Sequence, residues 1–566
     1  MKTLLVSILL GLSAIALHAQ DAPPLKDLNG FFPFEVPETL EAWEERAADL
    51  RQRVLVANGL WPMPEKTPLN PVIHGKFERP GFTVEKVYFE SYPGLFVTGL
   101  LFRPENPPEG KLPAVLSPHG HGGRLQDHGV EGVLKQIEGG GEKFKESGRM
   151  PKVARCATLA RLGCVVFLYD MFGYADSNQL SRGLAHGFKK QRPDFEGKDS
   201  WGLFSAQAEM RMQSIFGLQT WNSIRGLDFL ESLPDVDPKR IAVTGGSGGG
   251  TQTIMLCAID SRPIAGFPNG MVSSAMQGGC TCENASLLRI GTGNVELAAL
   301  FAPKPQGMTA ANDWTKEMLV PGKGFPELQK LYGMYGKVDN VICEDLLHFG
   351  HNYNYVSRAV MYSWFNKHLD LGLEEPIVEE DFKLLTAEEH AVWTVEHPEP
   401  EGGDEFERNL TNWIADQDQQ LLDAMTEGER RETVRAAWRT MIGASDLSGA
   451  VASSFSAVGS PEKTTLQTDP KSPSFSVFTA KPKGDFKFTV VWTHEKGKDG
   501  LFKGDGTPTP AVQGILDRGG RVITANLHLQ GDEINETPVV ANPRESASYT
   551  HAYNDSVFAE RVQNIL

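Results

Sequence analysis

The stretch RIAVTGGSGGGTQT, which begins at Arg240, places one serine among five glycines directly after a short apolar run. A loop of this kind either cradles a phosphate or presents a nucleophile. A phosphate-binding P-loop needs a lysine near its end, but this loop runs on as GTQT without one. A dinucleotide-binding fingerprint counted from Gly246 and Gly248 has Thr251 in place of its third glycine. The loop is therefore not expected to bind phosphate.

Residues Gly245 to Gly249 instead form a G-x-S-x-G pattern centred on Ser247. Between a strand and a helix, this pattern is typical of a nucleophile elbow, a sharp turn that tolerates only small neighbours and lifts the serine hydroxyl above the sheet edge. The helix that begins there directs its positive end toward a developing oxyanion. Ser247 is the predicted nucleophile, and the backbone N–H of Gly248 is one predicted oxyanion donor.

A serine nucleophile needs a base, and the base needs an acid that orients it. With this elbow, the chain order is serine, then Asp or Glu, then His. Asp313, which follows an apolar run in AAND, is the predicted acid, although it could also be the N-cap of the next helix; Glu283 is the alternative acid. His351, just ahead of a long helix, is the predicted base, and His348 is the alternative.

The loop HGHGG, from His119 to Gly123, follows the apolar run PAVLSP. Because lipase-type folds carry their second oxyanion donor at this position, the backbone N–H of His121 is predicted to complete the oxyanion hole. Metal binding by His119 and His121 together is not favoured, since no acid or cysteine lies near them in the sequence.

The six cysteines all lie between residues 156 and 343. Cys280 and Cys282 form a C-x-C that has no matching second pair, so a buried or locally bridged pair is expected rather than a four-ligand zinc site. The sequence therefore predicts no metal site, and the chemistry expected of Ser247 requires no metal or organic cofactor.

The elements around these residues alternate between strand and helix. Apolar runs at 111–120, 164–170, 240–246 and 263–270 predict buried strands, and helical periodicity appears at 153–163, 218–233, 249–260 and 355–372. This alternation predicts an α/β fold with a mostly parallel sheet covered by helices on both faces. Residues 176–219 are interpreted as an insertion over the carboxyl edge of the sheet, where it would shape substrate access.

Composition excludes several classes of function. The net charge of −17, with no long basic run, argues against nucleic acid as a partner. Residues 1–19 combine an early lysine with a short apolar run and predict a signal peptide, hence a secreted or periplasmic protein; no later run is long enough for a membrane span.

The sequence predicts three regions after the signal peptide. A catalytic domain is expected over residues 20–385, and a linker and helical region over 386–470. Residues 471–566 are expected to form a partial second copy of the same fold, non-catalytic because no second G-x-S-x-G follows residue 400. The expected match pairs FTVVWTHEKGKDG with LPAVLSPHGHGG, and the chain ends before any counterpart of the serine strand.

From about Lys111 to Leu369 the chain resembles α/β-hydrolases, especially secreted bacterial proteins of the acetylxylan-esterase-like and dienelactone-hydrolase-like groups. The resemblance rests on SPHGHGG, DMFGYADS, IAVTGGSGGGTQT, APKPQGMTAANDW and HNYNYVSRAVMYSWFNKHL. It implies an exported serine esterase, a carbohydrate esterase that removes acetyl or related esters from polysaccharide through a Ser-Asp-His triad. Two alternatives stay open: a serine peptidase of the prolyl-oligopeptidase type, and a non-catalytic carbohydrate-binding or scaffold protein on a hydrolase fold.

Overall fold

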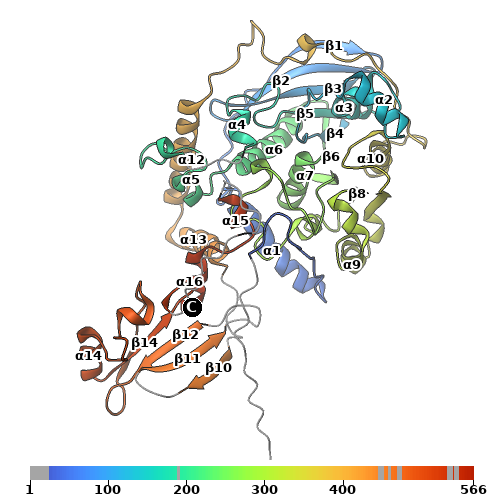
Figure 1. The fold of residues 1–566 in the computed structure, drawn as a ribbon. Coiled ribbons are helices and arrows are strands. Elements are labelled where there is room, and N and C mark those ends of the chain that lie inside the picture. The colour runs from blue at the N-terminus through green and yellow to red at the C-terminus, as the bar shows by residue number, and fades with distance from the viewer. Residues whose placement is uncertain are drawn as a thin grey trace, which may run out of the picture. The chain divides into compact units, whose positions relative to one another are not determined.

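The computed structural model describes residues 25–187, 192–443, 451–456, 461–467, 475–531, 540 and 547–566. The predicted signal peptide lies outside this part of the chain. Two compact units are present (Figure 1). The larger one is formed by Lys26–Met441 together with Val540–Asp555, and the smaller one includes Ile442–Val539 and Ser556–Leu566.

The larger unit is built on a nine-stranded sheet in the order β1-β2-β3-β5-β4-β6-β7-β8-β9. The first three strands pair antiparallel, β3 pairs antiparallel with β5, and all pairs from β5 to β9 are parallel. The strands are β1 Val72–Arg79, β2 Phe82–Tyr92, β3 Leu95–Pro104, β4 Leu112–Leu116, β5 Val165–Tyr169, β6 Val236–Gly246, β7 Pro263–Asn269, β8 Gln306–Ala311 and β9 Val341–Leu346.

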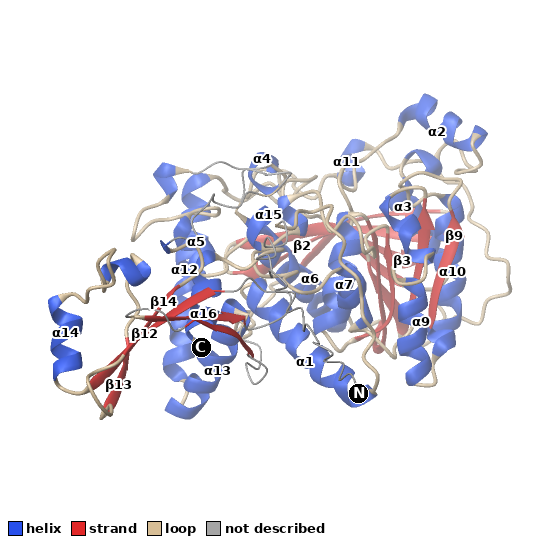
Figure 2. Cartoon of the chain, turned by 60° about the horizontal axis from the view of Figure 1, so that its bottom comes forward, coloured by secondary structure: helices blue, strands red, loops and turns tan. Residues whose placement is uncertain are grey.

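Helices lie on both sides of this sheet, as the alternation in the sequence predicts (Figure 2). The helices of the larger unit are α1 Leu40–Ala57, α2 Gly129–Glu138, α3 Pro151–Arg161, α4 Arg182–Ala185, α5 Ala206–Met210, α6 Ile215–Ser232, α7 Gly248–Ile259, α8 Asn294–Ala299, α9 Phe325–Met334, α10 Tyr355–His368, α11 Ala387–His390, α12 Asp404–Ala424, α13 Glu427–Ile442 and α15 Ser548–His551.

Side chains of β4 show how the two faces are filled. Val115 packs in the apolar cluster formed with α3 and α10, whereas Ala114 and Leu116 pack in the cluster formed with α6. All three side chains are fully buried. Successive residues of a strand point to opposite faces, so a strand that is apolar at every position must be covered on both faces. The central strands are therefore held in register by packing from two sides.

The carboxyl edge of the sheet carries the loops that will position the site. The loop after β4 is anchored by Arg124, which directly follows Gly123. Its guanidinium donates to Asp170 at 2.8 Å and also pairs with Asp176. Arg124 and Asp170 are completely buried. From α3, Lys152 donates to the backbone carbonyls of His121 at 3.2 Å and Gly123 at 3.0 Å. Charged side chains therefore hold the HGHGG loop in place in the ligand-free protein.

The helical region after residue 385 contributes to the core of the larger unit. Leu410 and Ile414 of α12 are buried in the cluster that also contains β2 and α6. Glu407 of the same helix accepts two hydrogen bonds from Arg192, at 2.6 and 2.9 Å, and one from the N–H of Leu203 at 2.7 Å. The compact unit accordingly extends to Met441.

The smaller unit contains a five-stranded sheet in the order β10-β11-β12-β14-β13. Pairing is antiparallel from β10 to β14 through β11 and β12, and parallel between β14 and β13. This is the order and direction of β1-β2-β3-β5-β4 in the larger sheet. The elements are β10 Val451–Ser456, β11 Glu462–Gln467, β12 Phe475–Ala480, β13 Phe488–Val491, β14 Gly520–Asn526, α14 Pro510–Asp517 and α16 Val557–Ile565. That this region is a partial second copy of the fold stays a prediction.

Within the described ranges, no helix combines the length and the apolar character that a membrane crossing needs.

Close backbone packing joins β6 and α7 to the strand beside them. A Cβ on Gly249 would lie 2.4 Å from the carbonyl oxygen of Pro118, and one on Gly245 would lie 2.5 Å from the same atom. Real Cβ atoms do not approach backbone oxygens this closely, so the glycines are required by contact between two segments of backbone.

We expect the substitution Gly249→Ala to lower the free energy of unfolding by about 1–3 kcal/mol, as overpacking of a filled core does. The matched control is Gly333→Ala in α9, where an added Cβ meets nothing within 4 Å. The thermal unfolding midpoint, measured by calorimetry, should fall for Gly249→Ala and stay level or rise for Gly333→Ala. An unchanged midpoint for Gly249→Ala would show that the elbow is loosely packed.

Candidate active site

Ser247 stands between the last residue of β6 and the first residue of α7. Its backbone has φ 56° and ψ −125°, a conformation that residues other than glycine rarely adopt. The strain is held in place because the Ser247 N–H donates to the carbonyl of Asn269 at 3.0 Å, and its own carbonyl accepts from Thr251 at 3.0 Å. This is the geometry expected of a nucleophile elbow.

The loop after β4 lies directly against this elbow. A Cβ on Gly120 would lie 2.8 Å from Cβ of Ser247 and 3.4 Å from the backbone nitrogen of Gly248. The backbone of the HGHGG loop and the first N–H of α7 are therefore neighbours, as an oxyanion hole made from Gly248 and His121 requires. The assignment of these two N–H groups as oxyanion donors stays a prediction.

Asp313 and His351 are joined by a hydrogen bond. Nδ1 of His351 lies 2.8 Å from Oδ2 of Asp313. The other carboxylate oxygen of Asp313 accepts from the backbone N–H and the hydroxyl of Thr315, at 2.7 and 2.5 Å. Asp313 thus caps the short helix Trp314–Leu319 and also bonds to the imidazole, so being an N-cap does not prevent it from orienting His351. Burial alone would raise the pKa of Asp313, but the hydrogen bonds from His351 and Thr315 outweigh it and lower that pKa.

The imidazole of His351 is placed over the elbow by its surroundings. Its ring lies against the ring of Trp314, with centroids 4.6 Å apart, and Trp314 is itself anchored by a 2.7 Å hydrogen bond to the carbonyl of Gly270. A Cβ on Gly270 would lie 2.8 Å from Cε1 of His351 and 3.7 Å from the backbone nitrogen of Ser247. With Nδ1 committed to Asp313, Nε2 is the nitrogen left for proton transfer. The His351 side chain is 34% exposed and Asp313 only 6%, so the predicted base faces solvent and the predicted acid is shielded.

The alternative acid and base have other partners. Oε2 of Glu283 accepts from the backbone N–H groups of Gly279 and Cys280 at 2.9 and 3.1 Å, and burial raises the pKa of this carboxyl. His348 packs against the ring of Phe349. Within the described part of the chain, neither Glu283 nor His348 makes a hydrogen bond to the predicted triad. The geometry therefore favours Asp313 and His351, and the triad remains a prediction.

His119 is a structural residue of the loop. It is fully buried, its Nε2 accepts from the N–H of Met171 at 3.1 Å, and its Nδ1 lies 3.0 Å from the carbonyl of Gly120. This pattern fixes the proton on Nδ1. Both ring nitrogens are used inside the protein, so His119 holds the loop and is not available to a metal.

Four side chains that the sequence left apart come together beside the elbow. His121, His186, Cys280 and Cys282 each have a ligand-type atom within 4.8 Å of the others. The bridge considered for the two cysteines is not formed, because all six cysteines are free thiols. The pKa of Cys280 is lowered, first by the hydrogen bond from Cys282 and then by those from the two histidines. The sequence analysis did not identify His186, which lies in the insertion 176–219, as a neighbour of the two cysteines.

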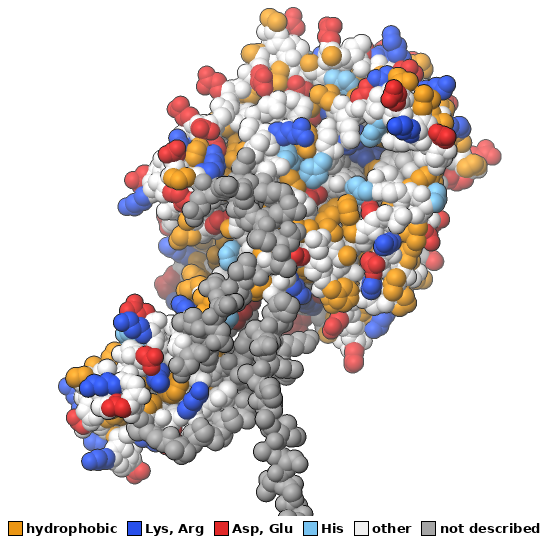
Figure 3. Space-filling model, in the orientation of Figure 1, with side chains coloured by type: hydrophobic (Ala, Val, Ile, Leu, Met, Phe, Trp, Pro, Cys, Tyr) orange, Lys and Arg blue, Asp and Glu red, His pale blue; other side chains and the backbone are white. Residues whose placement is uncertain are grey.

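Histidine side chains gather on the surface of the larger unit in the view of Figure 3, with apolar side chains around them. A cavity of about 420 Å³ borders the acid of the predicted triad. It is lined by Asn29, Gly30, Phe31, Ser274, Ala275, Asp313, Trp314, Lys316, Glu317 and Lys323. The lining contains aromatic, charged and small polar groups.

Comparison with known proteins gives partial matches. No family model matches the chain. The chain is 29% identical over 154 residues to the putative hydrolase YtaP of Bacillus subtilis, which covers 27% of this chain and 42% of that protein. The matched part therefore spans about two fifths of the length of this curated relative.

Solved structures similar to the chain include three esterases. Methylesterase BT1017 is 27% identical, with a TM-score of 0.47, over 65% of this chain and 74% of that one. A putative acetyl xylan esterase from Bacteroides fragilis is 16% identical, with a TM-score of 0.39, over 56% and 80%. A glucuronoyl esterase from Solibacter usitatus is 18% identical, with a TM-score of 0.37, over 58% and 94%.

The lowered pKa of Asp313 has a consequence for stability. In the unfolded chain this carboxyl has its ordinary pKa of 3.8, and in the folded chain its pKa is lower. Between the folded pKa and 3.8, the unfolded state therefore binds more protons than the folded state. The stabilisation by the carboxylate is complete above 3.8 and is lost as the pH falls through the folded pKa.

We expect Asp313→Asn to lower the thermal unfolding midpoint at neutral pH. The difference in midpoint between the variant and the wild type should become smaller below about pH 4. A difference that is constant down to about pH 3 would contradict this account.

The arrangement of the elements defines the fold of the larger unit. A central parallel sheet follows antiparallel strands, a strained serine turn joins β6 to α7, and an acid–histidine pair comes from the loops after β8 and β9. The chain order is the one that this fold uses. By its strand order and its serine turn, the larger unit has the α/β-hydrolase fold.

Proposed function

We propose that the chain is an exported serine esterase that hydrolyses acetyl esters on polysaccharide. The observation that carries the proposal is the 2.8 Å Asp313–His351 hydrogen bond. It is supported by the position of Gly270, where an added Cβ would lie 2.8 Å from Cε1 of His351 and 3.7 Å from the backbone nitrogen of Ser247 on its strained turn. An oriented base next to a serine on such a turn is the arrangement that acyl transfer requires.

The first half of the reaction forms an acyl-enzyme. Nε2 of His351 takes the proton of the Ser247 hydroxyl, and the Ser247 oxygen attacks the ester carbonyl carbon. The tetrahedral intermediate carries its negative charge on the former carbonyl oxygen, which accepts from the N–H groups of Gly248 and His121. Collapse of the intermediate breaks the bond to the alcohol, which leaves with the proton from His351.

The second half releases the acid. Water gives a proton to His351 and attacks the acyl carbon, and Ser247 departs with that proton restored. Throughout, Asp313 holds the imidazole in one tautomer and stabilises its charged form. Because the Asp313 carboxylate is 6% exposed and fixed by Thr315, its charge is screened little by solvent.

A cavity of about 420 Å³ is lined by Asp313 and Trp314, the two side chains that contact His351. Since His351 is partly exposed, we infer that this cavity receives the alcohol component of the ester. An aromatic ring and polar side chains at one cavity suit the apolar and hydroxylated faces of a sugar. These features, with the resemblance found in the sequence, support a polysaccharide ester.

The peptidase alternative finds less support. Such enzymes usually carry a propeller ahead of the catalytic domain, whereas the described strands that precede β4 are β1, β2 and β3. These three strands extend the catalytic sheet.

We expect Ser247→Ala to lower kcat for p-nitrophenyl acetate and for acetate release from acetylated xylan by about a thousandfold or more. The matched control is Ser363→Ala, a serine of α10 whose hydroxyl bonds to Glu375 on the surface. Its kcat should stay within about twofold of wild type. Methyl and glucuronoyl esters belong in the same panel. Wild-type hydrolysis of none of these esters, or full activity in Ser247→Ala, would refute the proposed function.

A second pair of variants assigns the acid. Asp313→Asn should lower kcat by about 10² to 10⁴, because the imidazole loses its orienting charge. Glu283→Gln, matched in size and charge change, should leave kcat within about tenfold, because Glu283 bonds to backbone N–H groups rather than to His351. The reverse ranking in steady-state kinetics would show that Glu283 is the acid of the triad.

A further inference from the structure

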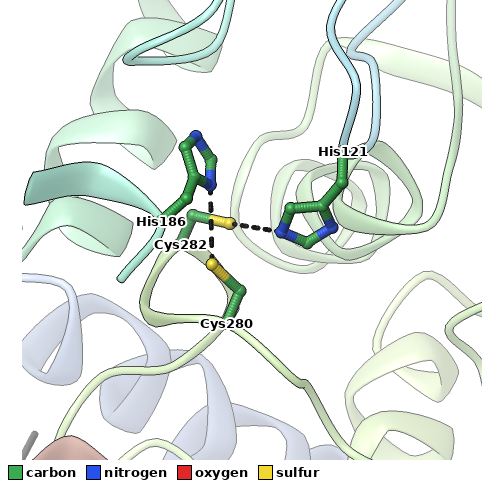
Figure 4. A group of neighbouring side chains, drawn as sticks. All are labelled: His121, His186, Cys280 and Cys282. Atoms are coloured by element: carbon green, nitrogen blue, oxygen red, sulfur yellow. Dashed lines mark hydrogen bonds between the residues drawn. The ribbon is translucent and has the colours of Figure 1, made fainter. Parts of the chain in front are cut away.

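We propose that His121, His186, Cys280 and Cys282 bind one zinc ion and that this ion fixes the HGHGG loop next to Ser247. Figure 4 shows the four side chains converging from three segments of the chain. One histidine comes from the loop after β4, the other follows α4, and both cysteines come from the loop after β7. Two thiolates and two imidazoles form a ligand set that zinc prefers.

The spacing of the ligand atoms fits a tetrahedral ion. In zinc sites the Zn–S and Zn–N bonds are about 2.3 and 2.0–2.1 Å, which places neighbouring sulfur and nitrogen ligands roughly 3.6 Å apart at tetrahedral angles. Sγ of Cys280 lies 3.5 Å from Nδ1 of His186, and Sγ of Cys282 lies 3.5 Å from Nε2 of His121. All four ligand atoms lie within 4.8 Å of one another. Small side-chain movements are enough to close the four around one ion.

His186 is already oriented as a metal ligand. Its Nε2 lies 2.6 Å from the carbonyl oxygen of Phe172, so this nitrogen carries the proton and donates it. Nδ1 is then the unprotonated nitrogen, and it faces Cys280. A metal-bound histidine usually donates its other N–H to a carbonyl or carboxylate, which sets the tautomer and the ring orientation.

Hydrogen bonds on both sides of His186 hold its segment to the cysteine loop. The hydroxyl of Thr281 donates to the carbonyls of Ala185 and Gly187, at 2.8 and 3.2 Å. The residue between the two cysteines is therefore tied to the residues before and after His186. The cysteine loop is braced in turn by Asn284, whose amide donates to the carbonyl of Cys280 at 2.9 Å. This preorganisation lowers the cost of gathering the ligands.

The two cysteines of the cluster are buried, whereas His186 is half-buried and His121 is exposed. Cys280 and Cys282 are 6% and 2% exposed. The four protein ligands would complete a tetrahedral shell and leave no open position, which is typical of a structural ion rather than a catalytic one. The ion would therefore not activate water.

The position of the cluster indicates what the ion does. A Cβ on Gly248 would lie 4.0 Å from Cε1 of His121, so the imidazole ligand reaches the first turn of α7. The side chain of His121 would hold the metal while its backbone N–H faces the oxyanion. The ion thus links the loops after β4, β5 and β7 at the edge of the sheet. The effect on ester hydrolysis rests on the proposed function, whereas zinc binding does not.

The first test is the metal content of the full chain, purified without chelators and without a histidine tag, by plasma mass spectrometry. We expect about one zinc per chain. The double variant Cys280→Ser, Cys282→Ser and the single variant His186→Ala should hold less than about a tenth of this amount. Cys343→Ser, which changes a thiol on β9 outside the cluster, should retain full zinc.

The second test requires no variant. Wild-type chain stripped by a chelator and loaded with Co²⁺ should show the visible absorption of tetrahedral cobalt and a thiolate charge-transfer band in the near ultraviolet. Any of three results would overturn the proposal. They are a disulfide between Cys280 and Cys282 in the intact mass spectrum, less than about a tenth of a zinc ion per chain after reconstitution, and stoichiometric copper or iron in place of zinc.

Hydrogen exchange tests the role of the ion separately from activity. Zinc removal should speed amide exchange by about tenfold or more in residues 119–124 and 278–284 and leave α3 unchanged; equal exchange with and without zinc would overturn the bracing role. For acetate ester hydrolysis, zinc removal should lower kcat about tenfold with little change in KM, and added zinc should restore it. A zinc-bound chain without esterase activity would refute the proposed function and leave the metal site standing.

Discussion

Contact between two stretches of backbone governs the geometry of the whole site. The turn from β6 into α7 presses against the end of β4, so closely that carbonyl oxygens of one segment occupy the space that side chains would need on the other. This contact fixes the height of Ser247 above the sheet and the position of Gly120 beside it. His351, Asp313 and the HGHGG loop lie around that fixed point. The buried pair Arg124–Asp170 supports the same loop from below.

Much of this arrangement is encoded locally. The strands and helices from β4 to α7 were predictable because apolar runs and helical periodicity alternate at short range, and the Ser247 elbow has a pattern with few other physical meanings. The α/β fold is confirmed. The Asp313–His351 pairing was expected from chain order, and the geometry favours it. Two edge strands, β1 and β9, escaped prediction because their burial is mixed and their pattern is weak.

The metal-type cluster could not be predicted from local patterns. Cys280 and His186 are 94 positions apart, and Cys282 and His121 are 161 positions apart. A C-x-C motif predicts a zinc site only when a second pair stands nearby in the sequence, and here the second pair is assembled by the fold. His186 carried no signal of its own, because a single histidine in a polar insertion is commonplace. The four side chains come together because the topology brings the loops after β4, β5 and β7 to one edge of the sheet.

Asp313 has two positions to hold at once, as a helix cap and as the hydrogen-bond partner of His351. One oxygen of its carboxylate closes the first turn of a helix, and the other orients the imidazole. Under the proposed function, the rotamer that caps the helix is also the rotamer that orients the base, and the free protein already holds it. Little reorganisation energy would then be left for the substrate to supply when it binds. A substitution that loosens this helix would also loosen His351, so the stability of the fold and the rate of the proposed reaction would depend on the same hydrogen bonds.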